Sequence, residues 1–268
     1  MSICLLNDIL KKLNKMKKIL SIGIVLASCL ATAQTSKMDK LLNLEKDAYF
    51  ADRDSAYVDP YYGLKKLIYG NKRFAQNKSI SPRQTEADLK NTKLGQKPFA
   101  TIIGCADSRV PNEIIFDQGV GDLFITRTAG QVMAEASYGT IEYASVALNT
   151  KLIVVLGHQS CGAVDAAMKL PENPPGHVVT LINAIKPATI KAKQANLSDS
   201  EELDLAVTAN VVEQVNLLRN LEPLLSRRFE SGELLIVGAV YNIESGKVEF
   251  IEETITSLPK FKNMAYND

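Results

Sequence analysis

The sequence contains no tryptophan, four cysteines and two histidines among 268 residues. Four cysteines are too few for a disulfide-stapled scaffold, and nothing in the glycine and proline content indicates collagen, a low-complexity linker or a solenoid. Charge of one sign is not in excess either: 31 basic and 30 acidic residues exclude a strongly basic nucleic-acid binder and an acidic disordered chain. The rest, 46% hydrophobic and 23% charged, indicates a globular protein with a sizeable core and favours an enzyme.

The amino terminus has the layout of a secretory signal peptide. Two lysines precede an apolar run at 19–27 that is too short for a membrane span, and small residues follow it. Residues 31–33 (ATA) supply an A-x-A cleavage pattern, so we predict cleavage after Ala33 and an exported, periplasmic protein without a membrane span. The alternative is a lipoprotein, because residues 26–29 (LASC) resemble a lipoprotein box that would place a lipid anchor on Cys29.

The expected organisation is one catalytic domain behind a short arm. Residues 1–33 form the signal peptide, the polar segment 34–60 forms an N-terminal helical arm, and the domain occupies 61–268. In that domain apolar runs of strand length alternate with helical patterns, and runs such as LIVVLG are typical of strands buried on both faces of a parallel sheet. We therefore predict an α/β fold, a single domain whose mostly parallel central sheet is flanked by helices.

The apolar periods place the elements of this fold. The expected strands are 99–104, 123–126, 152–157 and 234–241, followed by a hairpin loop and an edge strand at 248–252. The expected helices are 61–77, 137–149, 161–169, 178–195 and 200–229, with 78–98 as connection. In open α/β sheets ligands bind at the carboxyl ends of the strands, so the residues that follow these runs are candidates for a site.

The candidate metal ligands lie at two such strand ends. Cys105 follows the run TIIG, and His158 follows LIVVLG, with Cys161 three residues further on in a turn that opens a helix. Two thiolates and an imidazole are ligands that zinc prefers, and three protein ligands leave the fourth tetrahedral position for water. With residues 1–33 removed, Cys105 and Cys161 are the only cysteines. A disulfide between them is the alternative.

The residues next to Cys105 suggest how a metal site could be oriented. Asp107 is close enough in sequence to bind a metal itself or to accept a hydrogen bond from metal-bound hydroxide, and Arg109 can hold its carboxylate with a two-pronged pair. The alternative is an Asp-x-Arg pair in a solvated loop. The other histidine, His177, follows Pro-Pro-Gly and is predicted to be a surface residue.

Two motifs together resemble the zinc signature of the β-class carbonic anhydrases. They are residues 105–111 (CADSRVP) and 157–162 (GHQSCG), and weaker similarity extends from about residue 61 to 252. The resemblance implies zinc held by Cys105, His158 and Cys161, with Asp107 and Arg109 as the catalytic pair. It also implies reversible hydration of carbon dioxide to bicarbonate and a proton by zinc-bound hydroxide, in a homodimer or a tetramer built from it.

Further positions match the family's substrate pocket by their offsets from the ligands. They are Gln96, Phe124, Tyr143 and Gly162, and core packing is the alternative for the two aromatics. In the branch with a regulatory bicarbonate site a tryptophan lies three residues before the first cysteine; here that position is Ile102, so the resemblance is to the plant-type branch. Two alternatives to carbonic anhydrase activity stay open: a related zinc hydrolase acting on carbon disulfide or carbonyl sulfide, and a non-catalytic zinc or thiol protein.

Overall fold

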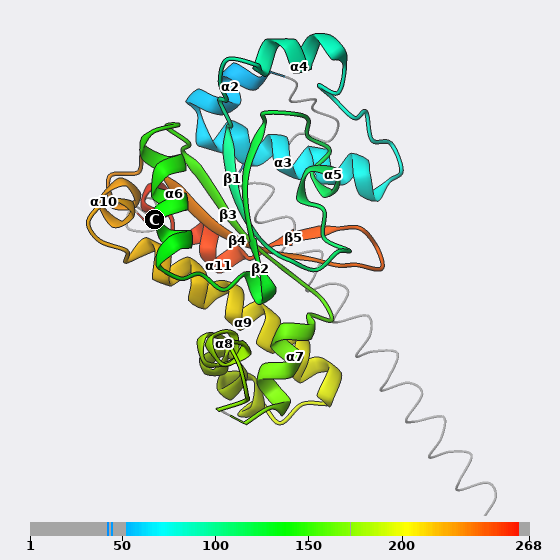
Figure 1. Ribbon diagram of the computed structural model, residues 1–268, viewed down its shortest axis with the longest axis vertical. Coiled ribbons are helices and arrows are strands. Elements are labelled where there is room, and N and C mark those ends of the chain that lie inside the picture. The colour runs from blue at the N-terminus through cyan, green and yellow to red at the C-terminus, as the bar shows by residue number, and fades with distance from the viewer. Residues whose placement is uncertain (1–41, 43, 45–51, 172, 263–268) are drawn as a thin grey trace, which may run out of the picture. The chain divides into compact units, whose positions relative to one another are not determined.

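The computed structural model describes residues 42, 44, 52–171 and 173–262, and its centre is one five-stranded sheet (Figure 1). The strands are β1 (Ala100–Cys105), β2 (Leu123–Thr128), β3 (Leu152–His158), β4 (Leu235–Tyr241) and β5 (Val248–Phe250). Their order is β2-β1-β3-β4-β5; only the last pairing, β4 with β5, is antiparallel. The predicted strands and the mostly parallel sheet are confirmed, although β5 is shorter than predicted because a helix begins at Glu252.

Burial explains why the strand predictions succeeded. Every residue of β1 and β3 is buried, as expected for inner strands of a parallel sheet covered on both faces. The edge strand β2 is half-buried along most of its length. Because β1 and β3 are neighbouring parallel strands, their carboxyl ends, Cys105 and His158, lie at the same edge of the sheet.

Helices cover the sheet. They are α2 (Arg53–Val58), α3 (Pro60–Ala75), α4 (Glu86–Thr92), α5 (Asn112–Ile115), the 3₁₀ turn η1 (Ala129–Gln131), α6 (Glu135–Val146), α7 (Gly162–Lys169), α8 (Val178–Lys193), α9 (Asp199–Arg219), α10 (Leu225–Glu230), α11 (Glu252–Thr256) and α12 (Pro259–Lys262). In the view of Figure 1, α7, α8 and α9 lie on one side of the sheet and α2, α3 and α4 on the other.

Helix α9 packs closely against β3 and β4 because two strand glycines leave room for it. A Cβ at Gly157 would lie 2.5 Å from Val211 Cγ2, and one at Gly238 would lie 2.7 Å from Val211 Cγ1. Both distances are shorter than real side chains tolerate, so any larger residue would push the helix away. This close approach also brings Asn210 of α9 to the Gly130 carbonyl oxygen, just beyond the carboxyl end of β2.

Two predicted boundaries were wrong. The helix expected at 200–229 is two helices, α9 and α10, because Pro223 has no backbone N–H and cannot continue a helix. The connection expected at 78–98 contains α4, whose capping box joins Thr85 and Asp88 reciprocally. The Thr-x-x-Asp pattern is a variant of the Ser/Thr-x-x-Glu signal that marks helix starts, and it was available in the sequence.

The predicted signal peptide at 1–33 and most of the predicted arm at 34–60 lie outside the described residues. Helix α2, at the end of that arm, belongs to the same compact unit as the sheet, which spans 49–268. Its Arg53 donates hydrogen bonds to the Lys97 and Gly121 carbonyl oxygens. Over the described part of the chain, no helix has both the length and the apolar character that crossing a membrane requires.

Candidate metal centre

Three side chains that could bind a metal converge at the carboxyl edge of the sheet. Cys105 ends β1, His158 ends the neighbouring strand β3, and Cys161 immediately precedes α7. Ser160 lies between the last two with φ of 53°, and this left-handed residue turns the chain back toward the strand end. The ligand atoms of Cys105, His158 and Cys161 all lie within 4.8 Å of one another, and all three residues are buried.

The histidine ring is already oriented for metal binding. Its Nδ1 lies 2.9 Å from the Gln159 carbonyl oxygen, which can only accept, so Nδ1 carries the proton and Nε2 presents its lone pair. Nε2 is buried and has no hydrogen-bond partner in the described part of the chain. A buried polar atom without a partner is costly, and a metal on Nε2 would remove that cost. The second nitrogen of metal-binding histidines commonly has such a carbonyl partner.

The Cys105 sulfur accepts two backbone hydrogen bonds. Gly130 N–H donates to its Sγ at 3.3 Å and Asp107 N–H at 3.5 Å. The Cys161 thiol, the His158 ring and these two amides lower the pKa of Cys105 well below its usual range. Both cysteines are free, so the structure does not form the alternative disulfide. Cys105 therefore favours the thiolate, which is the form that binds metals, whereas the neighbouring Cys105 sulfur and burial raise the pKa of the Cys161 thiol.

Asp107 and Arg109 form the two-pronged pair that the sequence predicted. Arg109 Nε donates to Asp107 Oδ1 at 3.0 Å and Nη2 to Oδ2 at 2.8 Å, while Arg109 N–H donates to Oδ1 at 2.9 Å. These bonds hold the pKa of the Asp107 carboxyl well below its usual range. Asp107 Oδ2 lies 3.8 Å from His158 Nε2, so the ionised carboxylate borders the cluster and is not a loop group facing solvent alone.

Arg127 on β2 is a functional candidate that the sequence did not single out. Its Nε donates to the Cys105 carbonyl oxygen at 2.9 Å and its Nη2 to the Asp107 carbonyl oxygen at 2.6 Å. Arg127 therefore fixes the backbone on both sides of Ala106, which lies between the candidate ligand Cys105 and the carboxylate of Asp107. The position of Arg127 in the strand pattern did not mark it as functional, because an arginine that points outward from an edge strand is common.

The predicted pocket residues do not gather around the cluster within one chain. Gly162 is exposed and adjoins Cys161, but Gln96 is exposed near the amino end of β1, opposite to Cys105. Phe124 is four residues before the end of β2, about 13 Å along the strand. Its ring lies 6.2 Å from that of Tyr143, which is 51% exposed. Their pocket roles therefore remain predictions.

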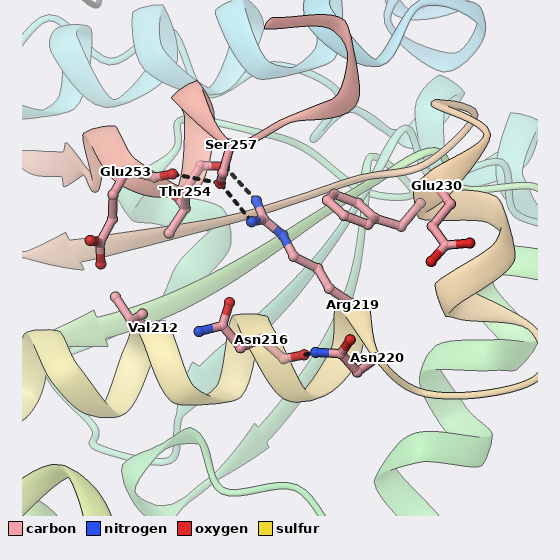
Figure 2. Close-up of a pocket in the computed structure, with 9 residues that line it drawn as sticks. Val212, Asn216, Arg219, Asn220, Glu230, Glu253, Thr254 and Ser257 are labelled. Atoms are coloured by element: carbon pink, nitrogen blue, oxygen red, sulfur yellow. Dashed lines mark hydrogen bonds between the residues drawn. The ribbon is translucent and has the colours of Figure 1, made fainter. Parts of the chain in front are cut away.

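A cavity of about 500 Å³ lies elsewhere, between α9, α10 and α11 (Figure 2). Figure 2 shows Arg219 reaching from α9 toward Thr254 and Ser257, and its guanidinium donates to the Ile236 and Thr254 carbonyl oxygens and to Ser257 Oγ. Burial lowers the pKa of Arg219 to about 10. Its bonds tie the end of α9 to β4 and α11, so we assign Arg219 a structural role. His177, at the start of α8, is exposed as predicted.

The donor set at the carboxyl edge fits zinc. Two cysteine sulfurs and one imidazole nitrogen form a set that zinc favours, and their number is that of catalytic zinc sites with an open fourth position. The unpartnered Nε2 of His158 and the hydrogen-bonded Cys105 sulfur point to the same ion.

Comparison with known proteins places this chain in a family. The family profile described as carbonic anhydrase matches residues 100–248. Carbonic anhydrase 2 of Mycobacterium tuberculosis is 41% identical over 193 residues, covering 71% of this chain and 92% of that protein. The carbonic anhydrase of Mycolicibacterium smegmatis is 38% identical over 194 residues, 71% of this chain and 93% of its own. The solved structure of the β-carbonic anhydrase CcaA, 29% identical, matches with a TM-score of 0.58 over 72% of this chain and 97% of that one. The chain belongs to the β-class carbonic anhydrases.

Proposed function

We propose that the protein catalyses the reversible hydration of carbon dioxide to bicarbonate and a proton, with zinc held by Cys105, His158 and Cys161. The observation that carries this proposal is the buried cluster of three ligand atoms within 4.8 Å. The reaction is that of the carbonic anhydrases to which the chain is similar. Zinc, when bound, supplies a Lewis acid that makes water nucleophilic near neutral pH.

Asp107 is the group that orients the reacting water. An ionised carboxylate can only accept hydrogen bonds, so Asp107 Oδ2, beside the cluster, would accept a hydrogen bond from a water molecule and thereby direct the water oxygen toward carbon dioxide. The three bonds from Arg109 keep this carboxylate ionised and hold it at the edge of the cluster. Arg109 thereby also keeps Asp107 from occupying the fourth position as a ligand.

The catalytic unit is proposed to be a homodimer. Among the described residues β2 has β1 as its only strand neighbour, and the outward face of α6 beside it carries Tyr143 and Val146, both more than half exposed. Exposed apolar side chains next to a free strand edge favour association. A second copy on this face would cover them and could receive the aromatic pair Phe124 and Tyr143 in its own substrate pocket.

The protein is also proposed to be exported, by the signal peptide predicted at 1–33. The support is the sequence pattern alone: a basic start, a short apolar run and an A-x-A site that ends at Ala33. Sequencing the amino terminus of protein recovered from the periplasm would test it. Gln34 at the terminus supports cleavage after Ala33, whereas a lipid-modified Cys29 would support the lipoprotein alternative.

A stopped-flow carbon dioxide hydration assay on protein of measured zinc content tests the catalytic proposal. His158→Ala should abolish both zinc binding and hydration. His177→Ala is the matched control, because His177 is exposed and remote in sequence from the ligands, and it should change neither. Zinc-loaded protein that hydrates no carbon dioxide but hydrolyses carbonyl sulfide or carbon disulfide would replace the proposed reaction with that alternative.

A further inference from the structure

A buried asparagine contacts the turn that lies beside the metal centre. Asn210 lies on α9 and is fully buried. Its Nδ2 donates a hydrogen bond of 3.0 Å to the Gly130 carbonyl oxygen, 80 residues away in sequence. Asn210 Oδ1 is buried without a partner among the described groups. The role of this side chain is therefore the hydrogen bond that its Nδ2 donates. An asparagine that only filled space would leave a buried polar atom unpaired without any compensating hydrogen bond.

The turn that Asn210 contacts has a backbone that needs support. Gly130 and Gln131 both have left-handed φ, 65° and 47°, and a non-glycine residue such as Gln131 adopts this conformation only at some cost. A Cβ at Gly130 would lie 2.7 Å from Ile185 Cδ1 and 3.2 Å from Ala163 Cβ. The glycine is thus wedged between α8 and α7, and Asn210 ties its carbonyl to a third helix.

The other side of the same residue faces the ligand. Gly130 N–H donates to Cys105 Sγ at 3.3 Å, while the Gly130 carbonyl accepts from Asn210. Rotating this turn would therefore break both bonds together. The side chain of Gln131 offers no substitute, because neither of its buried amide atoms has a partner in the described part of the chain.

We infer that Asn210 is a positioning residue of the metal centre, which fixes the Gly130 turn so that its N–H stays on the Cys105 sulfur. The inference rests on the proposed function in one respect, that Cys105 is a zinc ligand. Hydrogen bonds to ionised groups are about twice as strong as neutral ones. Loss of partners that support a metal's ligands commonly costs about 10–100-fold in metal affinity or activity.

The test compares two buried amides of the same helix. Asn210→Leu removes the donor with little change of shape. Gln214→Leu is the matched control, because Gln214 lies one turn further along α9, is also buried and has an unpartnered Oε1. We expect Asn210→Leu to bind zinc about 10–100-fold more weakly at fixed pH, measured by competition with a chelator, and Gln214→Leu to bind it as the wild type does.

A second readout separates positioning from a general loss of structure. In cobalt-substituted protein the sulfur-to-metal charge-transfer band should move to longer wavelength in Asn210→Leu, because a sulfur without its N–H donor gives electrons more readily. The band should stay unchanged in Gln214→Leu. Wild-type affinity together with an unchanged band in Asn210→Leu would overturn the inference.

A third measurement needs no variant, and so stands even if Asn210→Leu does not fold. In cadmium-113-loaded wild-type protein, the Gly130 amide proton should show coupling to the metal through the N–H···S bond, and its absence would contradict the inference. A wild-type chain that holds zinc on these ligands but hydrates no carbon dioxide would refute the proposed function and leave the role of Asn210 intact. A chain that binds no metal there would refute both.

Discussion

Replacing Arg109 with alanine should leave zinc in place and slow carbon dioxide hydration. Arg109 makes three hydrogen bonds to the Asp107 carboxylate, at 2.8, 2.9 and 3.0 Å; the substitution removes the two from its side chain. Without them the Asp107 pKa should rise toward its ordinary value of about 3.9. The carboxylate would still be ionised at pH 7, so the loss at neutral pH comes from misplacement and not from protonation.

The magnitude follows from how far Asp107 could move. Its Oδ2 is 3.8 Å from His158 Nε2, so a released carboxylate can reach the metal and compete with water for the open position. A displacement of about 1 Å at a reacting group can cost about 10²-fold in rate, and we expect kcat to fall by about 10–100-fold. Arg109→Lys keeps the positive charge but cannot make the two-pronged pair of a guanidinium. Its kcat should lie between those of the wild type and Arg109→Ala.

Stopped-flow kinetics and zinc analysis of the same samples check this prediction. Arg227→Ala is the matched control, because Arg227 pairs at 3.5 Å with Glu222 on an exposed surface, where such pairs contribute little. It should leave both kcat and zinc content unchanged. Normal turnover in Arg109→Ala, with a crystal structure that shows Asp107 in its original place, would refute the reasoning.

Three further substitutions and a pH profile test other parts of the structure. Cys161→Ser should strip zinc and activity together, because a neutral hydroxyl is a poor substitute for a thiolate; full metal content with full activity would contradict the ligand assignment. Tyr143→Asp should shift the protein toward monomer in sedimentation and lower kcat/KM, whereas an unchanged dimer would place the interface elsewhere. Gly238→Ala should lower the free energy of unfolding by about 1–3 kcal/mol, because its Cβ would overlap Val211; chemical denaturation measures this, and unchanged stability would count against the close packing of α9. The value of kcat/KM should rise with pH through one ionisation, the loss of a proton from the reacting water. Asp107 should add no second ionisation above about pH 4, because its pKa is lowered. A steep rise that involves several protons would mean that Asp107 closes onto the metal.

The strands and the cluster of Cys105, His158 and Cys161 were predictable because both depend on patterns that are local in sequence. β1 and β3 are buried throughout, so their apolar runs end where the buried segment ends, at Cys105 and His158. Cys161 then needs only a tight turn to join them. The pairing of Asp107 with Arg109 was predictable for the same reason, since only Ser108 separates them and the geometry of guanidinium and carboxylate leaves few alternatives.

The features that escaped prediction depend on contacts between distant segments. Nothing near Asn210 in sequence reveals that its amide meets Gly130, and Arg127 reaches Cys105 only because β1 and β2 are neighbours. Gln96 and Phe124 match pocket positions by offset, yet a single chain places them toward the other end of the sheet from the cluster. Sequence spacing names candidate residues for the pocket, but it does not say whether one copy or two would have to supply them.

The proposed ligands and the Asp107–Arg109 pair differ in burial, and this difference separates their roles. The proposed ligands Cys105, His158 and Cys161 are at most 4% exposed, whereas the side chains of Asp107 and Arg109 are 18% and 50% exposed. Such a buried ligand set would shield a bound metal from water on the protein side, and Gly130 N–H fixes the Cys105 sulfur from the interior. Water and carbon dioxide must then approach on the more open side, where Asp107 lies. In the proposed mechanism an incoming molecule therefore approaches on the side where Asp107 and the more exposed Arg109 lie, and the pairing of these two residues, rather than any of the three proposed ligands, determines whether that approach stays open.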